Sequence, residues 1–329
     1  MKIKITRLID KPIIPALLTQ EIGSNVQGPS LIKTPIWLSR PLGKYYLYFA
    51  DHKGDRIKLA YSDKLIGPWR IYSGGTLELK DSYFLNEVPK IPKDFDLNSL
   101  KPREAHPELI NHIPKKIDDL TLPHIASPDV HIDESNEKII MYYHGLDEFG
   151  LQKTRVATSK DGINFKAREK IVGWSYFRKF SYLKKDYAIS MPGVIYKNTG
   201  DIDDFTIVNQ VMKEDTRHSA VLVEGDKLLI FFSRKGDRPE RILLTTIDLT
   251  LPSSLWKTTS PIEVLRPERE WEGAYLPLYK SVESAINIPV NQLRDPAIYT
   301  EEGKNYLIYS IRGENGIGIV EFSLENIQK

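Results

Sequence analysis

One short pattern, a proline or polar residue followed by apolar residues, occurs five times along this chain of 329 residues. We call it the entry pattern, because it stands where each repeated unit is expected to begin. After a turn or loop, four of the five copies are followed by a run rich in β-branched and aromatic residues. Such runs, bounded by Gly, Asp and Asn turns, predict β-hairpins. The five copies are Gly28-Pro29-Ser30-Leu31, Ser127-Pro128-Asp129-Val130, Met191-Pro192-Gly193-Val194, His218-Ser219-Ala220-Val221 and Asp295-Pro296-Ala297-Ile298.

These repeats predict an all-β fold, a five-bladed β-propeller of four-stranded antiparallel blades. A unit of about four short strands cannot bury both of its faces alone, so neighbouring units must stack radially around an axis. We expect residues 1–329 to form a single propeller domain, and a short strand over residues 2–8 to complete the last unit. The predicted units cover residues 26–69, 124–170, 174–210, 217–265 and 294–322.

Residues 73–121 interrupt the pattern between the first and second units. This segment carries five prolines among Lys, Asp and Asn residues, so a regular sheet is not expected there. Long insertions without strands in compact domains usually serve as lids or binding loops, or are disordered. We predict an ordered loop that packs over one face of the domain.

Charge and composition exclude several classes of protein. Lys and Arg number 46 against 44 Asp and Glu, so the net charge of +2 gives no electrostatic footprint for nucleic acid. The chain has no cysteine, which excludes disulfides and thiolate chemistry. No stretch resembles a secretory signal or a membrane span. We expect a soluble, cytoplasmic protein with a carbohydrate partner and no nucleic-acid or membrane partner, and its oligomeric state stays open.

The chain resembles the five-bladed propeller glycosidases related to glycoside hydrolase family 43, the arabinanases and xylosidases. The resemblance rests on the entry pattern, on Asp295-Pro296, on Tyr45-Tyr46-Leu47-Tyr48, on Gly67-Pro68-Trp69 and on Arg217-His218-Ser219. It implies a glycan site in the axial funnel, where inner strands direct polar side chains at the axis. It also implies that His218 faces a metal or a water there, so a divalent metal such as calcium on the axis is left open as a cofactor.

The usual catalytic carboxylates of that family are not matched. Glycoside hydrolysis uses two carboxyl groups on either side of the scissile bond, whereas the residues before the first three entry prolines are Gly28, Ser127 and Met191. We therefore take Asp129 and Asp295, which lie within the entry pattern, as catalytic candidates. Either aspartate could instead cap a turn or bond the backbone of a neighbouring blade.

A third catalytic candidate is Glu272, which stands next to Trp271 in the stretch before the fifth unit. The indole of Trp271 could stack on a sugar, and burial could raise the pKa of Glu272 enough for it to act as an acid. The alternative is a surface loop that packs Trp271 between blades.

Four further residues are substrate-binding candidates. Arg217 and Arg294 precede entry patterns, and a guanidinium suits a carboxylate or a sugar diol, although salt bridges between blades are the alternative. His124, like His218, changes charge near neutrality and could serve as an acid or a metal ligand, but a histidine bonded between blades is at least as consistent with the sequence. His52 belongs to a polar turn at the mouth or the rim of the ring.

Three functions remain open at this stage. The first is a glycoside hydrolase acting on a glycan or oligosaccharide in the funnel. The second is a non-catalytic propeller that binds a glycan or a protein, which the missing carboxylates favour. The third is cleavage by His and Arg residues, which would act on uronic-acid polymers and leave an unsaturated product.

Overall fold

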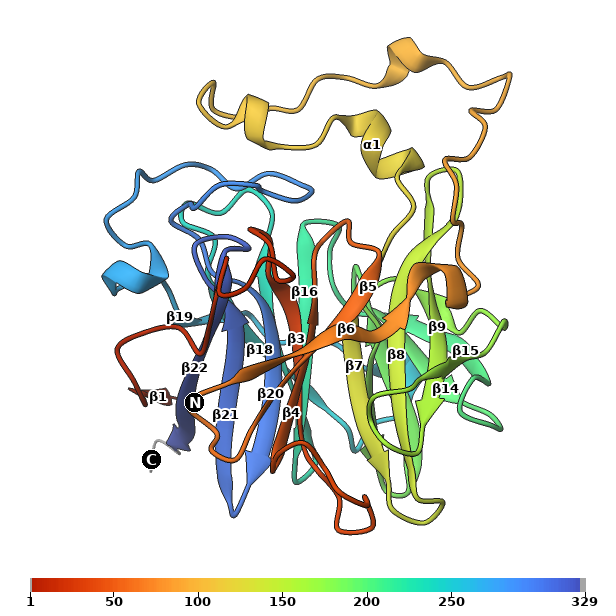
Figure 1. Ribbon diagram of the computed structural model, residues 1–329, viewed down its shortest axis with the longest axis vertical. Coiled ribbons are helices and arrows are strands. Elements are labelled where there is room, and N and C mark those ends of the chain that lie inside the picture. The colour runs from red at the N-terminus through yellow and green to blue at the C-terminus, as the bar shows by residue number, and fades with distance from the viewer. Residues whose placement is uncertain (1, 326–329) are drawn as a thin grey trace.

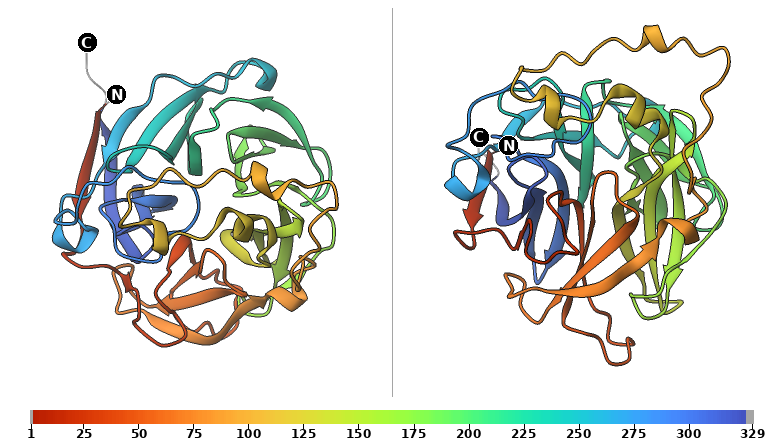
Figure 2. Two further views of the ribbon diagram at one scale, coloured as in Figure 1. Left: turned by 90° about the horizontal axis from the view of Figure 1, so that it is seen from above. Right: turned by 45° about the horizontal axis from the view of Figure 1, so that its top comes forward.

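The computed structural model describes residues 2–325, and within this range the strands form five antiparallel sheets around a central axis (Figures 1 and 2). The predicted five-bladed β-propeller is confirmed. Blade 1 contains β3 (Gln27–Lys33), β4 (Tyr45–Ala50), β5 (Arg56–Ser62) and β6 (Arg70–Glu78). Blade 2 contains β7 (Ile125–Asp133), β8 (Lys138–Glu148), β9 (Leu151–Ser159) and β10 (Lys166–Ala167), with β11 (Gly173–Trp174) also paired to β9. Blade 3 contains β12 (Arg178–Tyr182), β13 (Lys185–Ser190), β14 (Val194–Asn198) and β15 (Phe205–Gln210).

The remaining two blades close the ring. Blade 4 contains β16 (Thr216–Glu224), β17 (Lys227–Arg234), β18 (Ile242–Asp248) and β19 (Ile262–Leu265). Blade 5 contains β20 (Arg294–Glu301), β21 (Lys304–Ser310) and β22 (Gly316–Glu325), and its outermost strand is β1 (Lys2–Arg7) from the opposite end of the chain. The register from Lys2↔Glu325 to Arg7↔Val320 confirms that the N-terminal strand completes the last blade. The short strand β2 (Ile14–Pro15) also pairs with β22.

Each of the five interfaces between neighbouring blades has its own apolar core. Between blades 1 and 2, for example, Tyr48 and Phe165 meet edge to face with ring centroids 5.8 Å apart. Between blades 3 and 4, Tyr187 and Trp256 pack with centroids 5.0 Å apart. The β-branched and aromatic runs of the sequence therefore bury both faces of each sheet by stacking sheet on sheet.

The entry patterns lie on the innermost strands and break their register. A bulge occurs where β3, β7, β16 and β20 begin, because two residues of the inner strand face one residue of its neighbour. Gly28, Ser127 and Asp295 have positive φ angles of 61°, 49° and 48° at these bulges. A bulge re-aims side chains and interrupts pairing, and here it directs polar side chains into the axis.

The prediction that the third pattern opens a blade is wrong. Met191-Pro192 does not open a blade, because it lies in the turn between β13 and β14. The inner strand of blade 3 is β12, and the residue with positive φ just before it is Tyr176, at 59°. The Met-Pro-Gly sequence resembles the true entries because prolines and glycines are common in turns of either kind.

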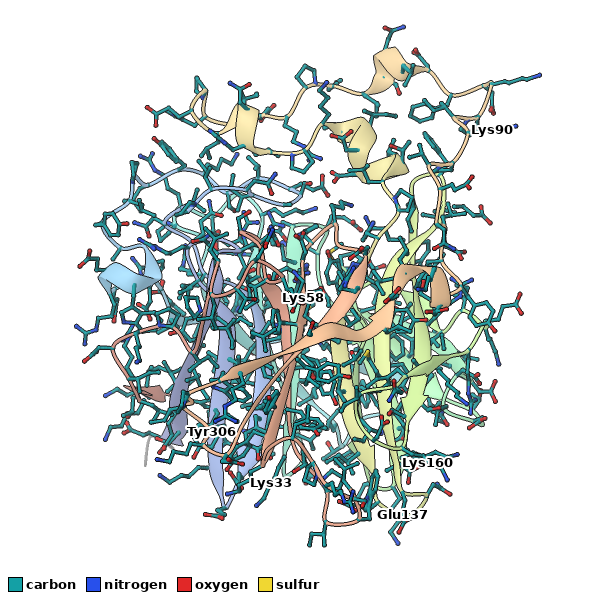
Figure 3. The ribbon with its side chains drawn as sticks, in the orientation of Figure 1. Lys33, Lys58, Lys90, Glu137, Lys160 and Tyr306 are labelled. Atoms are coloured by element: carbon teal, nitrogen blue, oxygen red, sulfur yellow. The ribbon has the colours of Figure 1, made fainter. Side chains whose placement is uncertain are left out.

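Residues 79–122 form a strap across one end of the propeller (Figure 2). The strap contains the 3-10 helices η1 (Leu79–Asp81), η2 (Leu97–Ser99) and η3 (Ile110–His112) and the short helix α1 (Lys116–Thr121). Strand β6 extends through Glu78, so the first residues of the range 73–121 belong to blade 1. Figure 3 shows Lys90 on the strap, with Glu137 and Lys160 near the other end of the propeller.

The strap is packed against the loop that precedes blade 5. Leu109 and Ile113 of the strap form an apolar cluster with Val282, Ile286 and Val290. The His106 ring also stacks on Tyr279, with centroids 4.4 Å apart. These contacts position the strap as a wall above the axis.

Two further 3-10 helices, η4 (Ser253–Leu255) and η5 (Glu270–Glu272), lie in the loops of blades 4 and 5. None of the helices in residues 2–325 has the length and apolar character needed to span a membrane.

Candidate functional site

A cavity of about 600 Å³ lies between the strap and the end of the propeller that the strap crosses. Its floor contains His52, Tyr176 and His218, and Trp174 lies on its side. The strap supplies Leu100, Arg103, Lys116, Asp119 and Leu120, and the blade loops supply further residues that include Lys53, Arg217, Lys235 and Glu283. The cavity therefore combines residues from the axis with residues from the insertion.

Two histidines on the floor are each bound to a buried carboxylate. His52 Nδ1 lies 3.1 Å from Glu314 Oε1, and His218 Nδ1 forms an ion-pair contact with Asp295 Oδ1. The two imidazole rings are neighbours, with centroids 6.4 Å apart. Because Nδ1 of each ring is engaged by a carboxylate, Nε2 is the nitrogen left for a ligand or a proton transfer.

Local structure explains how these pairs are held. His52 follows β4 in a tight turn, and its backbone N–H donates to Asn25 Oδ1 at 3.0 Å. Asn25 in turn donates to Glu314 Oε2 at 2.7 Å, so one amide fixes both members of the first pair. Asp295 sits in the β20 bulge and accepts a hydrogen bond of 3.0 Å from the Ser310 hydroxyl.

Burial and charge set the ionisation of these groups. Burial alone would raise the pKa of Asp295, but the charges of His218 and Arg294 outweigh it and lower that pKa. The pKa of Glu314 is likewise lowered, because His52 and Arg294 outweigh the effect of burial. Burial lowers the pKa of His218 in spite of Asp295. The Asp295 carboxylate is therefore held in its ionised form at neutral pH.

Tyr176 links the floor to two more buried histidines. Its ring stacks on His218 with centroids 3.6 Å apart, and it lies 4.1 Å from the ring of His144. His144 contacts His124, with ring centroids 5.8 Å apart. Burial raises the pKa of the Tyr176 phenol, so the hydroxyl stays protonated. Four of the seven histidines and one tyrosine thus form a continuous row of rings that ends at the cavity floor.

Beneath this row lies a buried ionic layer around Glu240. Arg217 Nε lies 2.9 Å from Glu240 Oε1, and Arg294 Nε lies 3.2 Å from Glu240 Oε2. Arg294 also contacts Glu314 Oε1 at 2.9 Å, although it is only 1% exposed. Of the two arginines predicted to bind substrate, Arg217 reaches the cavity wall, whereas Arg294 is not among the residues that line the cavity.

Asp129 lies on the inner strand of blade 2 but does not line the cavity. Its Oδ2 atom contacts His131 Nε2 at 2.7 Å and accepts a hydrogen bond of 2.8 Å from the backbone of Lys179 in blade 3. Arg178 lies alongside and donates to the carbonyl oxygens of Ser127 and Pro128 at 3.2 Å. The structure thus places Asp129 in a contact between blades, which is the alternative role considered for it.

His124 is fully buried behind the floor. Its Nδ1 lies 2.8 Å from the Leu122 carbonyl oxygen, at the end of the strap. Burial, aided by the nearby charge of Lys53, lowers the pKa of His124 to about 3. His124 is therefore neutral under ordinary conditions, and it adjoins the site through His144 and through Gln152, which lines the cavity.

Glu272 and Trp271 make their contacts outside this cluster of histidines and Tyr176. Glu272 is fully buried, contacts Arg7 at 2.9 Å and accepts a hydrogen bond of 2.8 Å from the Tyr309 hydroxyl. Trp271 packs into the core between blades 4 and 5. The structure does not bring either residue to the cavity, because Glu272 anchors the loop before blade 5 to Arg7 of the N-terminal strand and Trp271 is packed between blades.

A different tryptophan lines the cavity. Trp174 is 39% exposed, and the Lys153 ammonium lies 3.1 Å from the centroid of its indole ring. A half-exposed indole in a polar cavity is a surface on which a sugar ring can stack.

Within residues 2–325, no group of three or more His, Asp or Glu residues is arranged to hold a metal ion.

Comparisons with known proteins place this architecture in a family. The chain is 33% identical over 327 residues to an uncharacterized protein of Acanthamoeba polyphaga mimivirus, and the match covers 91% of this chain and 84% of that protein. The chain belongs to the same family as this mimivirus protein. No family model matches the sequence.

Solved structures of glycosidases share the fold of this chain. A β-xylosidase/α-arabinofuranosidase from a compost microbial metagenome aligns with a TM-score of 0.57 and 12% identity, covering 99% of this chain and 97% of the other. A thermostable family-43 glycoside hydrolase aligns with a TM-score of 0.56 and 16% identity, covering 92% and 91%. An endo-1,4-β-xylanase from Bacteroides thetaiotaomicron aligns with a TM-score of 0.55 and 14% identity, covering 90% and 89%. The resemblance to family-43 propellers is confirmed at the level of fold.

Several site residues of this family member were not predicted from the sequence. Glu240 and Glu314 lie in loops without a distinctive pattern, and His144 lies within β8 with no motif around it. Tyr176 precedes the inner strand of blade 3, and its place could have been inferred had β12 been recognised as the entry of that blade. Trp174 carried no signal beyond its residue type.

Proposed function

We propose that this protein is a glycosidase-like, carbohydrate-active protein that cleaves a glycan or oligosaccharide in the cavity under the strap. The observation that carries the proposal is the cavity floor, where His52 and His218 lie side by side and each is oriented by a buried carboxylate. The xylosidase/arabinofuranosidase with the same fold was solved with xylotriose, and a Cellvibrio cellulosa α-L-arabinanase with arabinohexaose.

The cavity has the size and surface that an oligosaccharide requires. Its volume of about 600 Å³ falls within the usual range for small-molecule sites. Trp174 offers an apolar face, and polar groups from the floor and the strap surround it. Sugars are bound in this way because their ring faces are apolar and their edges carry hydroxyl groups.

Histidines take the place of free carboxylates in this proposal. Asp295 and Glu314 are held in contacts with His218, His52 and Arg294, so neither is free to flank a glycosidic bond. An imidazole whose Nδ1 is bound by a carboxylate can accept or donate a proton at Nε2. Acid and base functions at the floor therefore fall to His52 and His218.

A non-catalytic glycan-binding propeller is the second candidate. The observation that favours it is the pairing of the acidic residues around the cavity. Asp119 is bound to Arg103 and Lys53, and Glu283 contacts Lys235 at 3.1 Å. Carboxylates in such pairs are poor general acids, because neighbouring cations favour their ionised form.

A screen with aryl glycosides and natural oligosaccharides separates the two candidates. For a cleaving protein, we expect sugar release that falls about 100-fold or more in His52→Gln and His218→Gln. His131→Gln is the matched control, because His131 also contacts an aspartate but lies outside the cavity. Trp174→Ala should weaken binding roughly fivefold to thirtyfold. Binding that depends on Trp174 without any cleavage would favour the second candidate.

A further inference from the structure

The cavity lining carries more positive than negative charge. Five lining residues are Lys or Arg and three are Asp or Glu, in addition to the two histidines of the floor. The cations are Lys53, Arg103, Lys116, Arg217 and Lys235, and the acids are Asp119, Glu214 and Glu283. In a chain whose net charge is only +2, this excess is a local property of the cavity.

The pairing of these groups leaves cationic capacity facing the cavity. Asp119 is shared by two cations, Arg103 and Lys53, whose Nζ lies 3.6 Å from it. In the part of the chain that the structure describes, Lys116 forms no ion pair, although it stands in the same first turn of α1 as Asp118 and Asp119, and of the three lining acids only Glu214 forms none. Lys116 also lies at the edge of a second, smaller hollow within the strap. An anionic group in the cavity would complete these interactions.

Next to these cations, the cavity floor provides a proton acceptor, His218, and a proton donor, Tyr176. His218 binds Asp295 through Nδ1, which leaves Nε2 as the basic nitrogen. The Tyr176 ring stacks directly on the imidazole and also lines the cavity, and a phenol is protonated at neutral pH. A base and an acid thus stand on one side of the cavity, with cations from the strap and from Lys53 around them.

We infer that the glycan carries a carboxylate, as a uronic acid does, and that the cavity cleaves it by β-elimination with His218 as base and Tyr176 as acid. This inference rests on the proposed function and specifies its substrate class and reaction. The cations of the wall, Lys116 and Lys53, bind the carboxylate. Neutralising that charge makes the hydrogen on the adjacent carbon more acidic.

The elimination step balances without a co-reactant. His218 Nε2 takes the proton from the carbon next to the carboxylate, and the electron pair of that C–H bond forms a carbon–carbon double bond. The bond from the next carbon to the glycosidic oxygen breaks, and its electron pair leaves with the oxygen. The Tyr176 hydroxyl protonates that oxygen, and return of the proton from His218 to Tyr176 through solvent resets the site. The products are an unsaturated uronate and a sugar with a free hydroxyl group.

A matched pair of ligands tests the charge requirement. An oligouronate and its carboxyl-reduced counterpart have the same rings and linkages and differ only in the charged group. We expect the oligouronate to bind at least about tenfold more tightly, because a charged hydrogen bond contributes more than a neutral one. Lys116→Met should remove most of this preference. Equal affinity for the two ligands would overturn the inference.

The product tests the reaction. We expect cleavage of the oligouronate to give a product that absorbs in the ultraviolet, because its double bond is conjugated with the carboxylate. Tyr176→Phe keeps the ring stack and removes the acid, so the rate should fall roughly 100-fold or more with little change in affinity. Tyr142→Phe is the control, because the Tyr142 hydroxyl bonds the Ile202 carbonyl oxygen outside the cavity and its loss should leave the rate unchanged.

The other outcomes separate this inference from the proposed function. Cleavage of neutral glycosides alone, or a saturated product from the oligouronate, would overturn β-elimination and leave the glycosidase proposal standing. Binding of the oligouronate without any cleavage would overturn the inference and support the non-catalytic propeller. A full rate in Tyr176→Phe would remove Tyr176 from the reaction and overturn the assignment of the acid.

Discussion

Gly28 and Ser127, on the inner strands of neighbouring blades, lie so close together that a Cβ atom on residue 28 would lie 2.8 Å from the Ser127 Cα. Both residues occupy bulges at the start of inner strands, and both have positive φ. These are two of the positions at which the resemblance to family-43 enzymes led us to look for carboxylates. The close approach of the two backbones leaves no room for a carboxylate side chain at residue 28.

Substitution of this glycine should therefore cost stability. We expect Gly28→Ala to lower the free energy of unfolding by about 2 kcal/mol or more, through strain at positive φ and the contact with Ser127. Gly225→Ala is the control, because Gly225 has φ +57° with no atom within 4 Å of an added Cβ. It should show only the strain. Denaturant titration measures both, and equal losses would mean that the two backbones can move apart.

The Arg294 guanidinium should be indispensable to the buried ionic layer. Arg294→Met leaves Glu240 and Glu314 without their shared cation, and a buried charge without a partner costs about 3–5 kcal/mol. Arg266→Met removes an exposed contact with Glu263 and should cost less than about 1 kcal/mol. Thermal and denaturant unfolding give the two values. Similar losses in both variants would show that the layer relaxes or admits water.

Asp119 should hold the strap over the cavity. Its carboxylate contacts Arg103 within the strap, Lys53 of blade 1 and the Ser284 hydroxyl at 2.7 Å. We expect Asp119→Asn to speed proteolysis within residues 79–122 by roughly fivefold to thirtyfold, because opening becomes easier by about 1–2 kcal/mol. Asp118→Asn is the matched neighbour, since the Asp118 carboxylate accepts its hydrogen bond from the Lys115 backbone at the start of α1. Equal cleavage of both variants would place the anchor of the strap elsewhere.

Acid should destabilise the fold through His124. The groups around its ring are Lys53, His52, His144, the Gln152 side chain and the Leu122 carbonyl oxygen, and burial with the Lys53 charge lowers its pKa to about 3. The unfolded chain, with a pKa near 6.5, binds the proton first, so stability falls as the pH drops from about 6.5 toward 3. The loss attributable to His124 should reach roughly 4–5 kcal/mol at full protonation.

His124→Asn checks this assignment, because an amide can still bond the Leu122 carbonyl oxygen and does not titrate. Melting temperatures measured from neutral to acidic pH should fall less steeply in this variant than in the parent. His112→Asn, at an exposed position of the strap, should leave the slope unchanged. A parental slope in His124→Asn would mean that other groups cause the acid sensitivity.

The propeller and its closure could be predicted because their determinants are local. Alternation in the strand around Tyr45-Tyr46-Leu47-Tyr48, turns of Gly and Asp, and the short N-terminal strand are visible along the chain. The entry patterns at Gly28, Ser127, His218 and Asp295 lie where inner strands begin. The pattern at Met191 failed, because a proline and a glycine within a blade turn look the same in sequence as those of an entry.

The candidate site was predicted only in part. His218, Asp295 and His52 stand out for their place in the entries and the first turn, and the structure brings His52 and His218 to the cavity floor, with Asp295 bound to His218 and Arg217 on the cavity wall. Asp129, Glu272 and Trp271 have the right residue types, but they are engaged in contacts elsewhere. Residue type alone does not say whether a carboxylate faces a cavity or a buried arginine.

The sequence by itself determined the repeat, the five blades and the polar inner strands, since periodicity and turn chemistry act over a few neighbouring residues. Only the tertiary structure decided the partners. Glu314 meets His52 across 262 positions of the chain, and Tyr176 stacks on a histidine of the next blade. Such contacts follow from closing the ring, which brings one loop from each blade to the same axis and leaves no local spacing between the residues that meet there.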